Sequence, residues 1–315
     1  MTSPFRKIMW FTVGDFVAKA AYDLAFLSLA RTRGVEAYGT LEFARAILTY
    51  FVKVSDGGLE MWAMRGTARG EAIEDLVSRV VPLRMLLGCT SFALLLLLLP
   101  VLPDFNSLRI LLVIFGFSIL VEASSLRWVF MGRERLVRAA AAMVGGQFLF
   151  AIGVLIFIAN PDSLPYVAGI RVAADLFISI YFFREYIRSY GRLTRSFSLR
   201  GATKVLREAI PFGLTHLLGL ATYSVDTLLL GFLKDAHAVG LYNAAYRPVT
   251  VCLAGPLAYF QGLDPVRSRT FSESREAFHA TAERSFRLAA LAALPLAIAT
   301  TFLAEPVLEF AYGGE

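Results

Sequence analysis

Several charged side chains lie inside long apolar runs of this 315-residue sequence, and they are the residues best suited to chemistry. Asp226 is the single charge in a run from Ala209 to Phe232, which has about the length that crosses a bilayer. An ionised side chain at mid-bilayer costs at least about 2.5–3.5 kcal/mol, so such groups normally face a partner or water. These charges are therefore candidates for binding an anion, coupling to an ion or pairing with one another.

The second apolar run carries a polar stripe along one face. At about 100° per residue, the polar positions fall within an arc of roughly 80°; they are Glu42, Arg45, Thr49, Lys53, Asp56 and Glu60. The other faces carry Leu, Ile, Phe, Val and Tyr, which lipid accepts. The stripe predicts a helix that lines a water-filled cavity, and the alternative is neutralisation between packed helices.

Two further sets of charges share helix faces. Asp15, Lys19 and Asp23 follow at i, i+4 and i+8 in the first run, which predicts an ion-pair ladder. Arg171 and Asp175 have the i, i+4 spacing in the sixth run. For a single pair of this kind, mutual neutralisation without any substrate is the simpler interpretation.

The composition indicates which elements must position these residues. Hydrophobic residues make up 57% of the chain, charged residues 18%, and the mean hydropathy is +0.61. These values are typical of an all-α, polytopic membrane helix bundle rather than a soluble domain. Nine spans are expected, at 8–30, 38–60, 81–102, 108–130, 139–159, 165–183, 209–232, 239–262 and 286–304.

The basic residues indicate an orientation. With the N-terminus in the cytoplasm, the loops and span ends place 22 basic residues inside and four outside, as the positive-inside rule requires. This asymmetry explains the pI near 9.4 without a nucleic-acid partner. Cys89 and Cys252 both lie in apolar runs and are expected to pack rather than to form a disulfide or a metal site.

The sequence also contains an internal repeat. The segments Asp23–Arg45 and Asp226–Arg247 each run from an aspartate through Leu-rich sequence and a short Gly-containing loop to an arginine, with an Asp-to-Arg spacing of 22 and 21 positions. Six spans separate the copies, so they predict two lobes of six-helix parallel repeats, with chance similarity of Leu- and Ala-rich helices as the alternative. The expected division is an N-terminal lobe at 1–184, a basic cytoplasmic linker at 185–208 and a partial second lobe at 209–315.

The repeat leads to a family resemblance. The pieces that carry it are "REAIPFGLTHLLGLATYSVDTLLLGFLKDAHAVGLYNAAYR" at 207–247, "LDPVRSR" at 263–269, "RGVEAYGTLEFAR" at 33–45 and "SDGGLE" at 55–60. In these blocks the chain resembles the polysaccharide exporters that flip lipid-linked oligosaccharides, within the multidrug, oligosaccharidyl-lipid and polysaccharide exporter superfamily. The resemblance extends over essentially the whole chain and rests on several loose motifs in the right order.

The resemblance implies a two-lobed, alternating-access flippase of the cell membrane, which carries an undecaprenyl-diphosphate-linked sugar unit to the outer leaflet. Lipid-linked oligosaccharide, membrane lipids and polysaccharide assembly machinery are then the expected partners. Guanidinium groups bind phosphate bidentately, so Arg45 and Arg247 are the candidates to meet the diphosphate. The remaining cavity candidates are Lys19, Lys53 and Arg171, and the candidates for coupling or ion pairing are Asp23, Glu42, Asp56 and Asp226, the last with Arg247 as its expected partner.

Two features depart from the family pattern. The second lobe is about half present where the chain stops at Glu315, so the sequence is expected to be either a truncated product or a part of a longer protein. Acidic residues also outnumber basic residues within the spans. A cationic cavity is therefore expected only where basic side chains lie apart from the acidic ones.

Rival functions remain open. A cation-coupled multidrug or small-solute antiporter of the same superfamily would need a coupling carboxylate, such as Asp226 or Asp23. A membrane glycosyltransferase or polymerase is less consistent, because no metal-ligand cluster, Ser/His/Asp arrangement or phosphate loop is evident. The sequence therefore predicts a non-enzyme without metal or cofactor.

Overall fold

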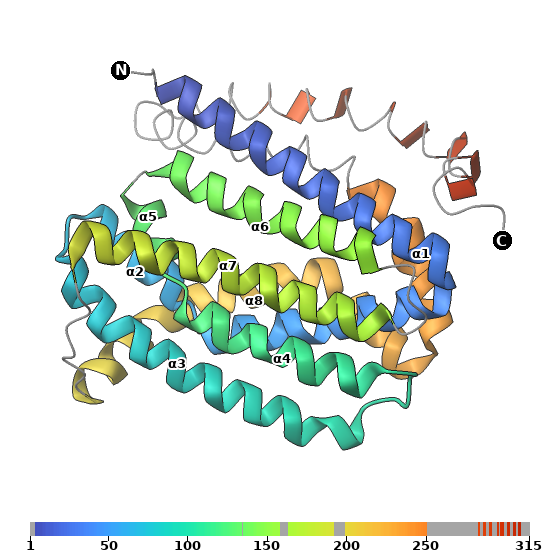
Figure 1. The fold of residues 1–315 in the computed structure, drawn as a ribbon, viewed down its shortest axis with the longest axis horizontal. Coiled ribbons are helices and arrows are strands. Elements are labelled where there is room, and N and C mark those ends of the chain that lie inside the picture. The colour runs from blue at the N-terminus through green and yellow to red at the C-terminus, as the bar shows by residue number, and fades with distance from the viewer. Residues whose placement is uncertain are drawn as a thin grey trace. The chain divides into compact units, whose positions relative to one another are not determined.

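The computed structural model describes residues 4–133, 135–157, 163–191 and 199–250, with single positions between 283 and 309. Every regular element in these ranges is a helix, which confirms the predicted all-α membrane bundle (Figure 1). In chain order they are α1 (Pro4–Asp56), α2 (Leu59–Ala68), α3 (Ile73–Leu98), the short 3₁₀ helix η1 (Leu99–Val101), α4 (Leu108–Ser124), α5 (Arg127–Gly132), α6 (Leu136–Phe157), α7 (Ser163–Tyr190) and α8 (Leu199–Leu233).

The first two expected spans form one element. α1 continues through the predicted loop and departs from helical geometry at Gly34, where φ is 81° and ψ is 172°. Residues with a Cβ avoid this positive φ, so glycine is what permits the kink. The predicted second span ended at residue 60, but α1 stops at Asp56 because Gly57 and Gly58 also adopt positive φ values.

Other boundaries differ from the sequence expectation for local reasons. α3 begins eight residues before the predicted 81, with Glu74 and Asp75 favourably placed in its first turn. The predicted span 108–130 is divided between α4 and α5 by Ser125 and Leu126. α7 and α8 extend into the predicted linker, since α7 ends at Tyr190 and α8 begins at Leu199.

Four helical segments in the described part have the length and apolar composition needed to cross a membrane: Ile73–Val101, Arg138–Phe157, Leu164–Tyr190 and Gly201–Leu233. The chain is thus a multi-pass membrane protein. Residues 1–240 form one compact unit and residues 241–315 a second. Residues 236–250 are helical, whereas most of the last two expected spans lies outside the described residues. The division into two parallel six-helix repeats stays a prediction.

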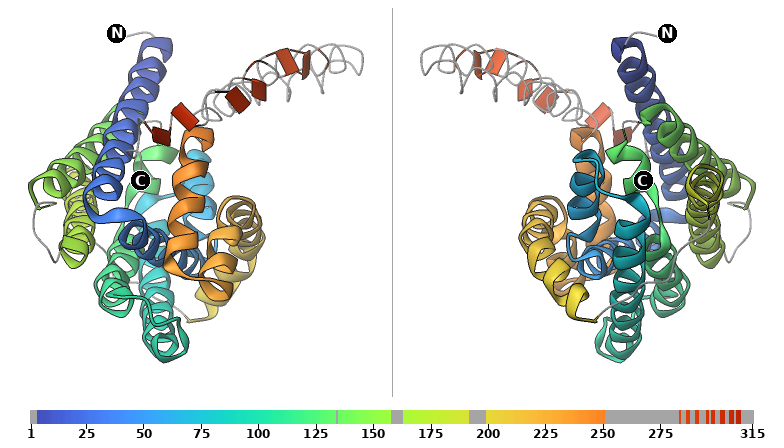
Figure 2. Two further views of the ribbon diagram at one scale, coloured as in Figure 1. Left: turned by 90° about the vertical axis from the view of Figure 1, so that its right-hand side faces the viewer. Right: turned by 90° about the vertical axis from the view of Figure 1, so that its left-hand side faces the viewer.

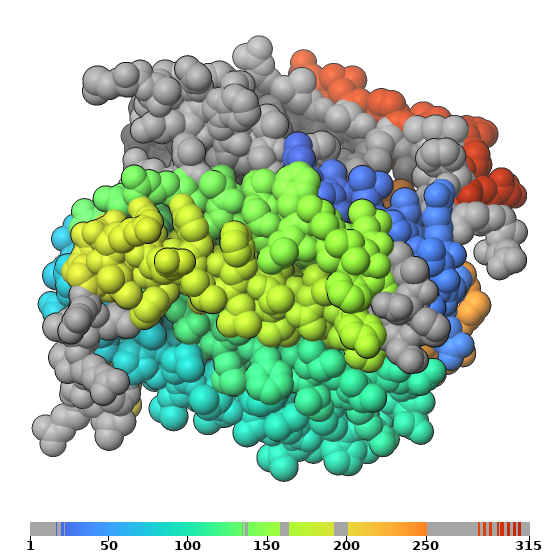
Figure 3. All heavy atoms as spheres, in the orientation of Figure 1, coloured from blue at the N-terminus to red at the C-terminus, as the bar shows by residue number. Residues whose placement is uncertain are grey.

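Within the first unit, α1 packs against α6, α4 and α8, and α7 packs against both α4 and α6. The two end-on views show α3 beside α4 and α6 beside α7 (Figure 2). In the space-filling view, α7 forms a continuous band between α6 and α4 (Figure 3). Its exposed side chains include Leu176, Phe177, Ile180 and Phe183, as expected for a surface that faces lipid.

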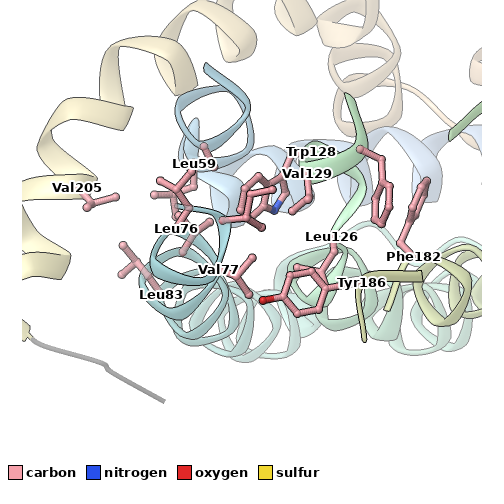
Figure 4. Packing of buried hydrophobic residues seen from close by; sticks show 14 of the residues in the cluster. Leu59, Leu76, Val77, Leu83, Leu126, Trp128, Val129, Phe182, Tyr186 and Val205 are labelled. Carbon is pink, nitrogen blue, oxygen red and sulfur yellow. The ribbon is translucent and has the colours of Figure 1, made fainter. Parts of the chain in front are cut away.

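One buried cluster holds the short helices in place. Trp128 and Val129 of α5 pack with Leu59 of α2, Val77 of α3 and Tyr186 of α7 (Figure 4). Val205 and Ala209 of α8 belong to the same cluster. This cluster joins α2, α3, α5, α7 and α8, and it fixes the positions of the charged residues that precede and follow α5.

Candidate functional site

A cavity of about 400 Å³ opens among α1, α4, α5, α6 and α7. It lies within the first unit, and the polar and basic members of its lining come from all five helices. Its lining consists of Phe26, Arg45, Leu48, Thr49, Val52, Lys53, Phe115, Ser118, Glu122, Arg127, Gln147, Phe150, Arg171 and Asp175.

The structure brings three of the predicted cavity candidates together. Arg45 and Lys53 lie eight residues apart on the second half of α1, and Arg171 reaches the same cavity from α7. Thr49, between the two α1 cations, also lines the cavity, and its hydroxyl donates to the Arg45 carbonyl oxygen at 2.7 Å. The middle of the predicted polar stripe thus faces a cavity, and the binding role of these residues stays a prediction.

The acidic member at the start of the stripe lies behind the cavity. Arg45 Nε donates to Glu42 Oε2 at 2.8 Å. The side chain of Arg45 is 44% exposed, whereas that of Glu42 is 1% exposed. The buried carboxylate therefore orients a guanidinium that lines the cavity.

Arg171 and Asp175 form the predicted i, i+4 pair, with Arg171 Nη2 and Asp175 Oδ1 3.1 Å apart. The Ser118 hydroxyl of α4 donates to the second carboxylate oxygen of Asp175 at 2.8 Å. The two interpretations of this pair are compatible, because its members neutralise each other and also line the cavity.

The sequence analysis missed the role of Arg127 in the lining. Arg127 was expected at the cytoplasmic end of the span 108–130, but its Nη2 lies 2.7 Å from Glu60 Oε1 of α2 and 3.4 Å from Glu122 Oε1 of α4. Helical periodicity contains no signal for this arrangement, since the chain breaks at Ser125 and Leu126 and Glu60 is 67 residues away.

Asp56, at the end of α1, lies outside the cavity lining. Its Oδ1 is 3.1 Å from Nε of Arg84 on α3, and the side chains are 8% and 2% exposed. The remaining guanidinium nitrogens of Arg84 donate to the carbonyl oxygens of Ser125 and Glu122, at 3.0 and 2.9 Å. Arg84 therefore joins the end of α1 to the backbone carbonyls where α4 ends, a contact that was not predicted from the sequence.

The remaining candidates are dispersed. Asp23 is half-buried on α1, and the side chain of Lys19 lies outside the described residues. Asp226 is half-buried on α8, where its carboxylate accepts a hydrogen bond from the backbone N–H of Thr227 at 2.8 Å. Arg247 belongs to the second unit, so its pairing with Asp226 stays a prediction.

The lining combines basic side chains, which suit an anion, with hydrogen-bond acceptors. Among the described residues, four basic and two acidic side chains line the cavity, which is a local excess of positive charge. Gln147 adds a buried Oε1 that has no hydrogen-bond partner in the described part of the chain. The described residues contain no group of three or more side chains suited to a metal ion.

Comparisons with known proteins place this geometry in context. The family model described as "Polysaccharide biosynthesis protein" matches residues 5–271. No curated protein sequence matches the chain.

Solved structures share the fold at low sequence identity. An inward-facing multidrug resistance MATE family transporter of the MOP superfamily has a TM-score of 0.73 at 15% identity, over 93% of this chain and 71% of that one. The outward-facing form of a MATE transporter gives 0.64 at 17%, over 97% and 74%. A MOP superfamily transporter from Pyrococcus furiosus, described as having a binding pocket of reverse polarity, gives 0.62 at 17%, over 99% and 74%.

Proposed function

The chain belongs to the polysaccharide biosynthesis protein family, and on this premise we propose that it is a transporter that flips lipid-linked oligosaccharide units across the cell membrane. The cargo is an undecaprenyl-diphosphate-linked sugar unit, moved from the cytoplasmic to the outer leaflet for polysaccharide assembly. The protein performs no covalent chemistry in this proposal. The basic loops support an N-terminus in the cytoplasm.

The observation that carries the proposal is the arrangement of cations around one cavity. Arg45, Lys53 and Arg171 converge on it from two helices, and the carboxylate that pairs with Arg45 is buried behind it. A diphosphate needs several donors in a fixed geometry, and paired guanidinium groups supply them.

The polar acceptors in the same cavity suit the sugar part of the cargo. Sugar hydroxyls donate hydrogen bonds, and the buried Gln147 Oε1 is an acceptor without a partner among the described residues. Phe26, Phe115 and Phe150 supply apolar surface in the same lining. The cavity thus combines groups for a charged diphosphate with groups for a neutral or acidic sugar.

The test is a flipping assay in proteoliposomes with a fluorescent undecaprenyl-diphosphate oligosaccharide, compared between the unchanged protein and Arg45→Gln. We expect Arg45→Gln to weaken cargo binding about tenfold or more, because a charge-assisted hydrogen bond contributes about 1.5–3 kcal/mol. Arg109→Gln is the matched control, since Arg109 pairs with Asp104 on an exposed surface and does not line the cavity. Equal flipping by unchanged protein, Arg45→Gln and protein-free vesicles would contradict the proposal.

A cation-coupled antiporter is the second candidate, and the two carboxylates of the cavity favour it. Glu122 and Asp175 face the cavity beside Arg127 and Arg171, so a proton or sodium ion has potential acceptors there. Dye efflux driven by a proton or sodium gradient, lost in Asp175→Asn and retained in Arg45→Gln, would favour this function over flipping.

A further inference from the structure

A second pocket lies at the ends of helices rather than within the bundle. It has a volume of about 420 Å³ and is formed by α2, the start of α3 and the start of α8. Its lining consists of Trp62, Arg65, Gly66, Arg69, Glu71, Arg79, Gly201, Lys204, Val205, Glu208 and Phe212. None of these residues lines the charged cavity described above.

The pocket is basic, and its cations are available. Four lining residues are basic and two are acidic. Arg69, Arg79 and Lys204 are exposed, and none of them forms an ion pair among the residues that the structure describes. Their combined charge therefore faces the opening of the pocket without an opposing carboxylate in contact.

Aromatic side chains hold the walls of this pocket together. The Arg65 guanidinium carbon lies 4.4 Å from the centre of the Phe212 ring, a cation–π contact between α2 and α8. Trp62 Nε1 donates to Glu208 Oε2 at 3.1 Å between the same two helices. One of the two acids is thus already engaged by an indole, and the walls are fixed in the absence of any ligand.

The depth of the pocket points to its ligand. It lies where two membrane-spanning segments begin, Ile73–Val101 and Gly201–Leu233, so it is level with the membrane–water interface. Lipid phosphates lie at this level, tryptophan is enriched there, and basic pockets between helix ends bind anionic headgroups.

We propose that this pocket binds the phosphate headgroup of an anionic membrane phospholipid such as phosphatidylglycerol. Arg69, Arg79 and Lys204 contact the phosphate, and Trp62 lies against the glycerol region. The bound lipid connects α2 to α8 at one end of the first unit, independently of the cargo in the charged cavity.

The experiment measures quenching of Trp62 fluorescence by brominated lipids in nanodiscs, with Trp62→Phe protein subtracted to isolate this indole. Brominated phosphatidylglycerol is compared with brominated phosphatidylcholine at equal mole fractions. We expect saturable quenching that favours phosphatidylglycerol, with the apparent affinity falling about fivefold for each charge removed in Arg69→Gln and Lys204→Gln.

Two controls keep the test decisive. Arg188→Gln removes an exposed charge of α7 that lies outside the pocket and forms no ion pair among the described residues, so it should leave the affinity unchanged. Arg69→Lys should retain the preference. Equal quenching by both lipids, or an unchanged affinity in Arg69→Gln/Lys204→Gln, would overturn the proposal. If inorganic phosphate binds the pocket but brominated phosphatidylglycerol does not quench Trp62 fluorescence, the ligand is a soluble anion and the lipid proposal is overturned.

Discussion

At the scale of single residues, the charged side chains within the helix bundle occupy two kinds of environment. Arg84 and Asp56 are almost fully buried and pair with each other, while Arg84 also binds two backbone carbonyls. Arg45 and Lys53 instead present charge to a cavity. The first kind of charge depends on its partner inside the fold, and the second kind lines a cavity.

Loss of Arg84 should therefore be costly to stability. Arg84→Met leaves Asp56 buried without its cation, and we expect the free energy of unfolding to fall by about 3–5 kcal/mol. Thermal unfolding in detergent measures the change, with Arg109→Met as the control because its pair with Asp104 is exposed and contributes about 0–1 kcal/mol. A midpoint for Arg84→Met that equals the control midpoint would show that the buried pair does not stabilise the fold.

The predicted partnership of Asp226 and Arg247 has its own test. Asp226→Asn and Arg247→Gln should each reduce transport at least tenfold if each leaves an uncompensated charge near the cargo path. The exchanged variant Asp226→Arg/Arg247→Asp should recover much of the activity. A silent Asp226→Asn would mean that this aspartate only packs.

At the scale of elements, α8 approaches the end of α1 more closely than side chains allow. A Cβ on Gly213 would lie 2.7 Å from the carbonyl carbon of Gly57 and 3.0 Å from the nitrogen of Gly58. The helices therefore meet backbone to backbone at the point where α1 ends. This contact depends on Gly213 of α8 and on Gly58 in the turn that follows α1.

A methyl group at this contact should separate the two helices. We expect Gly213→Ala to lower the free energy of unfolding by about 1–3 kcal/mol through overpacking. Gly219→Ala on the same helix meets open space, so it should be neutral or stabilising by up to about 1 kcal/mol. Chemical or thermal unfolding of the two variants side by side gives the comparison, and equal effects would rule out the close contact.

The elements also show what a sequence reveals and what it does not. The stripe from Arg45 to Lys53 was predictable because neighbours at i+4 share a face of one helix, and the cavity lies on that face. The contacts of Arg127 and Arg84 were not predictable from the sequence. Their partners, Glu60 and Asp56, are 67 and 28 residues away, and the contacts depend on how separate helices pack. Apolar length predicted the spans, but only the dihedral angles show that Gly34 bends one helix where a loop was expected.

At the scale of the whole molecule, the asymmetry of basic residues predicts which helix ends face the cytoplasm. Ser107 precedes α4, at an end predicted to lie outside, and Ser189 lies at the last turn of α7, predicted to lie inside.

Cysteine labelling tests this orientation directly. In a Cys89→Ser/Cys252→Ser background, we expect Ser107→Cys to react with a membrane-impermeant maleimide on intact cells. Ser189→Cys should react only after the cells are permeabilised. The reverse pattern would invert the topology and place the basic loops outside.

The buried Asp56–Arg84 pair has a consequence for inheritance. A substitution at only one of the two positions leaves the other side chain as a buried charge without its partner. A protein that carries only one of the two substitutions therefore folds poorly. Relatives should therefore keep both residues or replace both together with apolar residues of similar volume.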